Sequence, residues 1–328
     1  MSYPILVVDD MPANLKLCKS ILEQSGYRCC FAQSGEEALM RARAEQPQLI
    51  LLDIMMPQMD GYQVCRELKS HRSTCHIPVI FITALNGEAD ETAGFAAGGV
   101  DYITKPLSAP RLLARIRNQL SLVQLDELEQ TRRLIVQKLG RAAEYKDNET
   151  GYHVIRMSHY SRLLGLAAGL SDSEAELLFH AAPMHDVGKI GTPDFILLKE
   201  DKLSADEWQI MKQHPLIGAD IIGQHDIPLL RAAREIALTH HEKWDGSGYP
   251  HGLAGKDIPL FGRIVAIADV FDALTSKRPY KSGWSLTETC QRLRSEAGVH
   301  FDPELVEYFL APETFAQVEK VYREWPDN

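Results

Sequence analysis

The sequence has no apolar run long enough to cross a membrane. Its longer runs, such as Leu49–Leu52 and Val79–Ile82, are a fraction of the roughly 20 residues that a spanning helix needs. The N-terminus also lacks the basic, apolar and small-residue order of an export signal. We therefore expect a protein that stays in the cytoplasm and has no membrane partner.

C-x-x-C motifs and an excess of basic residues are missing too. The six cysteines include no C-x-x-C pair, so they are interpreted as small buried hydrophobic residues and not as a disulfide or zinc framework. A net charge of −10 argues against a protein that coats nucleic acid. No helix-turn-helix with a basic recognition face is visible either, so DNA binding is not expected.

The length and the histidine distribution point to two domains with different chemistry. The chain has 328 residues, of which 45% are hydrophobic and 24% charged, which is typical of a globular protein with more than one domain. Ten of the twelve histidines lie after residue 150. We expect the second half to carry the histidine chemistry.

Residues 4 to about 120 alternate short β-rich apolar runs with helical stretches. This alternation predicts an α/β fold with a doubly wound, five-stranded parallel sheet, whose site lies at the carboxyl ends of the strands. The predicted strands are Ile5–Val8, Arg28–Phe31, Leu49–Leu52, Val79–Thr83 and Asp101–Ile103.

Three carboxylates are predicted at one edge of this sheet. Asp9, Asp10 and Asp53 follow or end predicted strands, so their negative charges would crowd into one cleft. Oxygen-only ligands suit Mg²⁺, and Lys105 could neutralise the remaining charge. The pattern indicates a magnesium site.

These motifs resemble the receiver domain of bacterial response regulators over residues 1–120. The matching segments are Val8-Asp9-Asp10, Leu52-Asp53-Ile54-Met55-Met56-Pro57, Ile82-Thr83-Ala84 and Thr104-Lys105-Pro106. The resemblance implies that Asp53 accepts a phosphoryl group from a sensor histidine kinase. It also implies a cis bond between Lys105 and Pro106.

The resemblance further implies roles for the residues around the phosphoacceptor. Asp10, Asp53 and the Met55 carbonyl would hold Mg²⁺ with help from Asp9. Thr83 and Lys105 would contact the phosphoryl oxygens, and Tyr102 would be the aromatic switch. Added charge at Asp53 would then bias a two-state surface near the last strand and helix.

A long helix is expected to join the two halves. Ser108 and Pro110 begin it, and no helix breaker follows until Gly140. We take residues 121–146 as a helical linker. Its apolar spacing fits either a parallel coiled coil, and hence a homodimer, or a packed single helix.

After residue 147 the strand patterns vanish, so residues 147–328 are predicted to form an all-α domain. Ser204 with Glu207 and Ser285 with Glu288 fit the capping box, and Asp302 precedes a proline at a helix start. Glu242 to Gly262 form a long irregular segment, of a length that is usually functional in a compact domain.

Histidines and carboxylates in this domain are spaced like metal ligands. Glu149 and His153 are four residues apart on one helix face, while His185-Asp186 and His240-His241 are adjacent pairs. Asp269 lies in an apolar helix, where a carboxylate is costly unless it is paired or bound to metal, and Asp272 shares its face. Together they favour two transition-metal ions over one. His159, His180, His225 and His300 are interpreted as surface or core residues.

These segments resemble the HD phosphohydrolases and, more narrowly, the HD-GYP family, over about residues 141–315. The matching segments are Met184–Gly191, His240–Pro250, Ile267–Thr275 and Arg278–Lys281. The resemblance implies one metal on His153, His185, Asp186 and Asp269, and a second on Asp186 with His214, His240 and His241. Glu149 would support a third ion in some members. Fe, Mn, Ni, Co and Zn all suit such ligands.

By the same resemblance the substrate is cyclic di-GMP, which is opened to pGpG and further to GMP in some members. Asp186 and Lys189 would be the catalytic residues. The expected substrate contacts are Lys189, Tyr249, Asp272, Arg278 and Lys281, although the glycines and proline around Tyr249 also fit simple turns. Pro183-Met184 departs from the family pattern and predicts a bend before His185.

A function of another class stays open at this point. The helical half could serve as a signalling adaptor that binds partners such as diguanylate cyclases through the loop around Gly246–Pro250. The intact ligand set argues against that as the sole role.

Overall fold

The computed structural model describes residues 4–84, 88–146, 152–276 and 283–326. The chain divides into two compact units, Met1–Glu129 and Gln130–Asn328. The boundary lies inside the helix α5 (Ala109–Lys146). Val136 and Ala143 of this helix are buried in the core of the second unit, so its second half belongs to that unit instead of forming a free linker.

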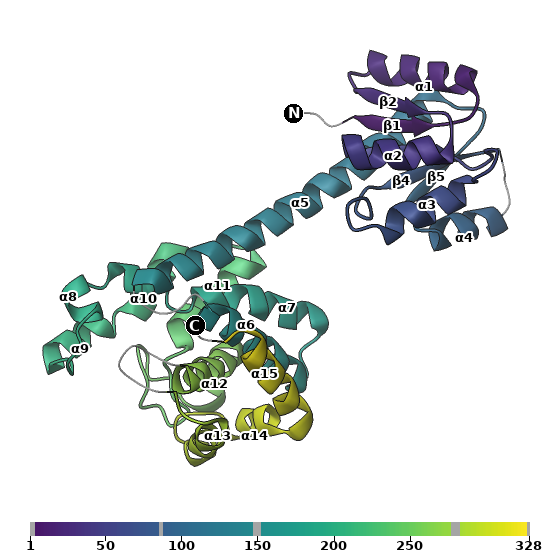
Figure 1. Ribbon diagram of the computed structural model, residues 1–328. Coiled ribbons are helices and arrows are strands. Elements are labelled where there is room, and N and C mark those ends of the chain that lie inside the picture. Colours follow the sequence, from purple (N-terminus) through teal and green to yellow (C-terminus); the bar gives the residue numbers. More distant parts are fainter. Residues whose placement is uncertain (1–3, 85–87, 147–151, 277–282, 327–328) are drawn as a thin grey trace. The chain divides into compact units, whose positions relative to one another are not determined.

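The first unit is a parallel sheet with helices on both faces (Figure 1). The five strands pair in parallel, as the sequence predicts, and their order is β2-β1-β3-β4-β5. The strands are β1 (Ile5–Val8), β2 (Cys29–Ala32), β3 (Leu49–Asp53), β4 (Val79–Thr83) and β5 (Asp101–Thr104). The other helices of this unit are α1 (Pro12–Gln24), α2 (Gly35–Glu45), α3 (Gly61–Ser70) and α4 (Glu88–Ala96).

Alternation along the strands builds two cores in this unit. Leu6 and Val8 of β1 pack in the core that α2 and α3 cover. Ile5 and Val7 point to the opposite face and pack in the core that α1 and α5 cover. The three central strands β1, β3 and β4 are therefore buried on both sides, which explains why they read as continuous apolar runs.

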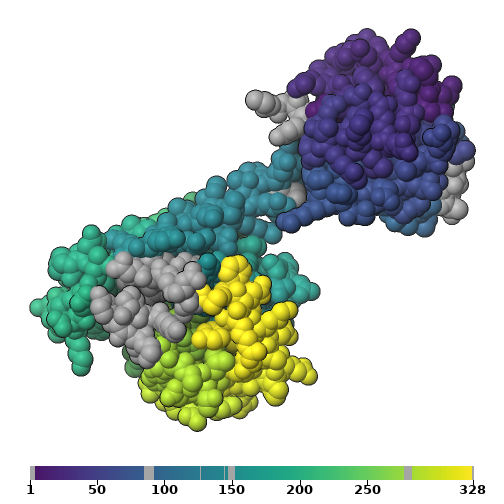
Figure 2. Space-filling model, viewed as in Figure 1, coloured from purple at the N-terminus to yellow at the C-terminus, as the bar shows by residue number. Residues whose placement is uncertain are grey.

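The second unit is helical, and no β-strand occurs among its described residues. Figure 2 shows its C-terminal helices, in yellow, on the surface. The helices are α6 (Tyr152–Ala167), α7 (Asp172–Ala181), α8 (Asp194–Leu197), α9 (Ala205–Met211), α10 (His214–Ile222), α11 (Pro228–Thr239), α12 (Leu260–Thr275), α13 (Leu286–Ser295), α14 (Pro303–Leu310) and α15 (Pro312–Glu324). Short 3₁₀ turns are η1 (Ala182–Met184), η2 (Val187–Gly191) and η3 (Gly255–Asp257).

Helix α6 lies at the centre of this unit and packs against α7, α12, α14 and α15. Its Tyr160 ring meets Phe271 of α12 at 5.2 Å, and Phe271 meets Phe309 of α14 at 5.1 Å. These edge-to-face contacts fix α6 against α12. Both helices carry candidate metal ligands, so the core sets the geometry of the site.

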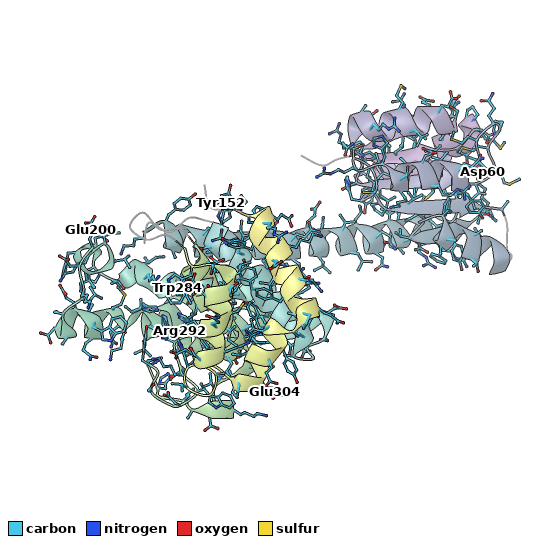
Figure 3. All side chains as sticks on the ribbon, turned by 60° about the horizontal axis from the view of Figure 1, so that its bottom comes forward. Asp60, Tyr152, Glu200, Trp284, Arg292 and Glu304 are labelled. Atoms are coloured by element: carbon cyan, nitrogen blue, oxygen red, sulfur yellow. The ribbon has the colours of Figure 1, made fainter. Side chains whose placement is uncertain are left out.

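The predicted helix starts are present. Capping boxes form at Ser204 and Ser285, and Asp302 accepts the backbone N–H of Glu304 at the start of α14. Asp60, labelled in Figure 3, caps α3 in the same way. Local hydrogen bonds of this kind are legible in sequence because they join residues two or three apart.

None of the helices formed by the described residues is both long and apolar enough to cross a membrane.

Candidate active site

His240 and His241 follow the last turn of α11. The Nδ1 atom of His240 lies 3.1 Å from the carbonyl of Ile236 and 3.2 Å from that of Ala237. Because a carbonyl can only accept, Nδ1 must carry the proton, and the lone pair of Nε2 faces away from the helix.

The rings of His185 and His214 are oriented in the same way, by a hydrogen bond from Nδ1 to a backbone carbonyl. Nδ1 of His185 lies 3.1 Å from the carbonyl of Ala182, and Nδ1 of His214 lies 2.8 Å from the carbonyl of Met211. Both residues sit at element ends, His185 after η1 and His214 at the start of α10. Pro183 lies in η1, so the chain leaves the α-helical form just before His185, as the proline predicts.

The first ligand cluster consists of Asp186, His214, His240 and His241, whose ligand atoms lie within 4.8 Å of one another. Oδ1 of Asp186 is 3.1 Å from Nε2 of His214 and 3.4 Å from Nε2 of His240. These three atoms are buried and form no hydrogen bond of good geometry with any described residue. A divalent cation would satisfy all three, so these residues fit a metal ion.

The second cluster consists of His153, His185 and Asp269. Oδ1 of Asp269 is 3.4 Å from Nε2 of His153 and 3.9 Å from Nε2 of His185. Oδ2 of Asp186 is 3.3 Å from the same nitrogen of His185. Asp186 therefore lies between the clusters, with one carboxylate oxygen toward each.

The electrostatics favour the protonation states that metal ligands need in the first cluster. Burial would raise the pKa of Asp186, but Lys189 and His185 outweigh it and hold that pKa well below its ordinary value. Burial lowers the pKa of His240 and His241, which favours neutral imidazole. An ionised carboxylate beside neutral histidines is the state that binds a cation.

The segment that carries His185 and Lys189 is fixed from two sides. A Cβ on Gly188 would lie 1.8 Å from the carbonyl of His214, so η2 packs directly on α10. From α5, Nζ of Lys146 donates to the carbonyls of Ile190 at 2.8 Å and Thr192 at 2.7 Å. The backbone that follows Asp186 therefore has little freedom.

Lys189 and Tyr249 border the ligand clusters. Nζ of Lys189 is 2.8 Å from Oδ2 of Asp186. The ring of Tyr249 stacks on His241 with centroids 4.7 Å apart, and burial raises the pKa of its phenol. Both lie where a substrate near the clusters would meet them.

The loop that carries Tyr249 is held by Glu242, a residue that the sequence patterns did not single out. Its buried carboxylate accepts the backbone N–H of His251 at 2.7 Å and of Leu253 at 3.0 Å. A carboxylate directly after two candidate ligands was the only signal in sequence. The loop is therefore anchored to the end of the ligand-bearing segment.

The expectation that Asp272 contacts substrate is wrong in this structure. Asp272 is fully buried, and its Oδ2 lies 2.8 Å from Nδ1 of His153. Arg156, which sequence reasoning also missed, donates to both of its oxygens. Asp272 orients a ligand instead. Glu149, Arg278 and Lys281 lie outside the described residues.

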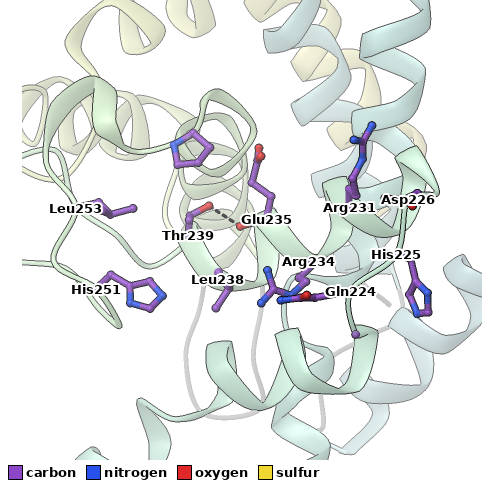
Figure 4. Close-up of a pocket in the computed structure, with 12 residues that line it drawn as sticks. Gln224, His225, Asp226, Arg231, Arg234, Glu235, Leu238, Thr239, His251 and Leu253 are labelled. Carbon is purple, nitrogen blue, oxygen red and sulfur yellow. Dashed lines mark hydrogen bonds between the residues drawn. The ribbon is translucent and has the colours of Figure 1, made fainter.

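A pocket of about 700 Å³ lies apart from these clusters (Figure 4). It is bordered by Arg231, Arg234 and Glu235 of α11 and by His251 and Leu253 of the loop. None of the predicted ligands or substrate contacts lines it. It is therefore not part of the predicted active site.

In the first unit the three predicted carboxylates meet at the strand ends. Asp9, Asp10 and Asp53 bring their oxygens within 4.8 Å of one another. Nζ of Lys105 is 2.7 Å from Oδ2 of Asp53 and 3.1 Å from Oδ2 of Asp9. Thr83 ends β4 at the same edge and is buried.

Burial raises the pKa of Asp53, while its hydrogen bond to Lys105 partly opposes this. Tyr102 lies on β5, where its ring meets Phe95 at 6.3 Å, and the side chain of Met55 is exposed. Only the backbone of Met55 is invoked for metal binding. The Lys105-Pro106 bond is cis, as expected.

Comparison with known proteins covers both halves. The model of the HD domain matches residues 125–305, and that of the response regulator receiver domain matches residues 5–117. A Vibrio cholerae protein named "Probable cyclic di-GMP phosphodiesterase" is 40% identical over 94% of this chain and 77% of its own. The "Cyclic di-GMP phosphodiesterase response regulator RpfG" of Xanthomonas campestris is 38% identical over 97% of this chain and 89% of its own.

A third relative matches just over half of the chain. The "3'3'-cGAMP-specific phosphodiesterase 2" of Vibrio cholerae is 48% identical over 56% of this chain and 35% of its own length. The two domain models and the nearly full-length relatives agree with the motifs read from the sequence. The chain therefore belongs to the family of response regulators that join a receiver domain to an HD domain of the HD-GYP type.

Proposed function

We propose that this chain is a response regulator that hydrolyses cyclic di-GMP to pGpG, and further to GMP if a third metal binds. The observation that carries the proposal is the pair of ligand clusters on either side of the buried Asp186. Two of the relatives that align over nearly the whole chain are named for this activity.

Two divalent transition-metal ions, of Fe, Mn, Ni, Co or Zn, are the proposed cofactors. One ion would be held by His153, His185, Asp186 and Asp269. The other would be held by His214, His240 and His241 together with Asp186, which would be a ligand of both ions. Such ions supply Lewis acidity and a water activated for attack on phosphorus. Glu149 is the proposed ligand of a third ion.

The chain's own groups would bind and orient the substrate. The ammonium of Lys189 would stabilise charge on a non-bridging phosphoryl oxygen beside Asp186. Arg278 and Lys281 would bind the substrate phosphates, because a guanidinium fits phosphate bidentately even in an acidic protein. Tyr249 would line the nucleotide pocket.

In the receiver domain, Asp53 is the proposed acceptor of a phosphoryl group from a sensor histidine kinase. Asp10, Asp53 and the Met55 carbonyl would hold Mg²⁺ with help from Asp9. Thr83 and Lys105 would contact the phosphoryl oxygens, and Tyr102 would act as the switch. Lys105 already lies within 2.7 Å of Asp53, which supports this role.

One experiment tests the enzymatic proposal. The purified full chain, loaded with Mn²⁺, is offered cyclic di-GMP and 3′3′-cGAMP, while products and bound metal are quantified in the same sample. We expect pGpG from cyclic di-GMP and a loss of activity in Asp186→Ala. If cyclic di-GMP stays uncleaved while two metals are bound, it is not the substrate. Cleavage of 3′3′-cGAMP alone would make the chain a phosphodiesterase for that dinucleotide instead.

An adaptor that binds diguanylate cyclases is the competing proposal for the second domain. Its phenotype in cells would survive Asp186→Ala, whereas that of a phosphodiesterase would not. We favour the enzyme because an adaptor has no need of buried, unsatisfied ligand atoms.

We also propose that the protein acts as a homodimer through α5. The helix exposes several large apolar side chains: Leu122, Leu125, Leu128, Leu134, Ile135 and Leu139. A second copy would cover them.

A further inference from the structure

A completely buried ion pair crosses the second unit. Arg156 and Asp272 are both 0% exposed. Nε of Arg156 donates to Oδ1 of Asp272 at 2.6 Å, and Nη2 donates to Oδ2 at 2.8 Å. A buried pair of this kind is a poor source of stability, because desolvation offsets the attraction between the charges. Its presence calls for another role.

The position of the pair gives that role. Arg156 lies three residues after His153 on α6, and Asp272 lies three residues after Asp269 on α12. Residues three apart share one face of a helix. The ion pair therefore joins the two helices one turn from two candidate ligands of the same metal.

Asp272 also acts on one ligand directly. Its Oδ2 lies 2.8 Å from Nδ1 of His153. The carboxylate accepts the Nδ1 proton and leaves Nε2 of His153 toward Asp269, 3.4 Å from Oδ1. His153 thus depends on a side chain for its orientation, where the other three oriented histidines use backbone carbonyls.

Arg156 in turn ties this arrangement to the last helix. Nη1 donates to the carbonyl of Trp325 at 2.8 Å, just after α15, and Nη2 donates to Oγ of Ser276 at 2.6 Å. The planar guanidinium fixes Asp272 in two directions at once. A lysine in place of Arg156 would keep the positive charge, but it would lose the paired N–H donors that bind both oxygens of Asp272.

We propose that Arg156 is a positioning residue for the metal bound by His153, His185 and Asp269, and that it acts through Asp272. The inference rests on the proposed metal sites. It predicts a selective effect, since Asp272 contacts His153 of one cluster, whereas Asp186, His214, His240 and His241 form the other cluster. Loss of this paired hydrogen bonding should weaken metal binding at His153, His185 and Asp269. Metal binding at His214, His240 and His241 should be unchanged.

The test uses the full chain stripped with a chelator and titrated with Mn²⁺ by calorimetry. In the parent we expect the two sites of the second unit, apart from the receiver site, which also accepts a divalent cation. In Arg156→Lys we expect one site weakened about 10- to 100-fold and the other unchanged. Saturating Mn²⁺ should then restore phosphodiesterase activity, because every ligand is still present.

The matched control is a second ion pair in the same unit. Nη1 of Arg263 is 2.6 Å from Oδ2 of Asp302, and their side chains are 13% and 2% exposed. Arg263→Lys should lower the melting temperature and leave both Mn²⁺ affinities unchanged. A structural role alone would make Arg156→Lys behave like this control.

The outcomes separate the inference from the function it rests on. A parent without Mn²⁺ sites overturns both. Two parent-like sites in Arg156→Lys, or equal weakening of both, overturn the inference alone. If Arg156→Lys does not fold, Asp272→Asn carries the same test, because an amide oxygen can still accept from His153 but no longer attracts Arg156.

Discussion

At the scale of single residues, His185, His214 and His240 fix their rings by donating Nδ1–H to backbone carbonyls. The sequence predicts these histidines as ligands from their spacing, but not the carbonyls, which depend on how each helix ends. His153 has Asp272 in place of a carbonyl. The contact between Asp272 and His153 depends on the packing of α6 on α12. Such tertiary packing cannot be predicted from a local sequence pattern.

Lys189 is expected to act on the substrate and not on the metals. Lys189→Met should lower the turnover of cyclic di-GMP by about 100-fold or more, because a preorganised cation is lost beside the reacting phosphate. Metal content, measured on the same sample, should stay at the parent value. Lys199→Met, which removes an ion pair with Glu207 elsewhere in the unit, is the control. If Lys189→Met lost bound metal and activity together, the role of Lys189 would be to position Asp186 as a metal ligand.

His300 should make the metal-free protein sensitive to acid. Burial, with Lys243 nearby, lowers the pKa of His300 from 6.5 to about 4. Between pH 6.5 and pH 4, His300 is protonated in the unfolded chain but neutral in the folded protein. The free energy of unfolding therefore falls as the pH drops from 6.5 toward 4.

Urea unfolding of chelator-treated protein at pH 7 and pH 5 measures this effect. His300→Gln should reduce the loss of stability between the two by on the order of 2 kcal/mol. An unchanged loss in the variant would show that other groups, such as His159, control it.

At the scale of elements, the packing of η2 on α10 is the tightest contact in the candidate site. A Cβ on Gly188 would meet the carbonyl of His214 at 1.8 Å, whereas a Cβ on Gly218, across the same contact, would have its nearest neighbour at 3.2 Å. A side chain at position 188 is excluded by sterics, whereas a Cβ at position 218 needs its neighbours to give way by only a few tenths of an ångström.

Gly188→Ala should therefore destabilise the protein by about 3 kcal/mol and reduce metal binding, because His185, Asp186 and His214 must shift apart. Gly218→Ala should stay within about 1 kcal/mol of the parent, since alanine favours the helix. Thermal unfolding with metal analysis compares the two. Equal effects would contradict the close approach seen at Gly188.

Much of the element-level fold could be predicted because its causes are local. The apolar runs Ile5–Val8 and Val79–Thr83 match β1 and β4, and the capping boxes mark the starts of α9 and α13. The burial of Asp272 and the anchoring of the loop by Glu242 could not be predicted. Both depend on partners that the tertiary fold brings close.

At the scale of the whole molecule, α5 contributes to both compact units. Val136 and Ala143 face the core of the second unit, while Leu128 and Ile135 are exposed. The sequence left a coiled coil and a packed helix open. The second half of α5 is packed within its own unit and still presents apolar side chains to solvent.

Phosphorylation of Asp53 is expected to promote dimerisation through these side chains. Sedimentation of the full chain with and without a beryllium fluoride mimic should show a shift toward a dimer, and Asp53→Ala should abolish it. Leu128→Glu should also abolish the shift. Leu17→Glu, on α1 and equally exposed at 45%, should not. Equal sedimentation with and without the mimic would refute the prediction.

The contact between Arg156 and the carbonyl of Trp325 has a practical consequence. The indole of Trp325 lies 5.9 Å from the ring of Tyr152, the residue before His153. Fluorescence from this tryptophan should therefore change when metal binds, in a variant whose Trp208, Trp244 and Trp284 are phenylalanine. The protein would then carry a built-in optical probe for one of its two proposed metal sites.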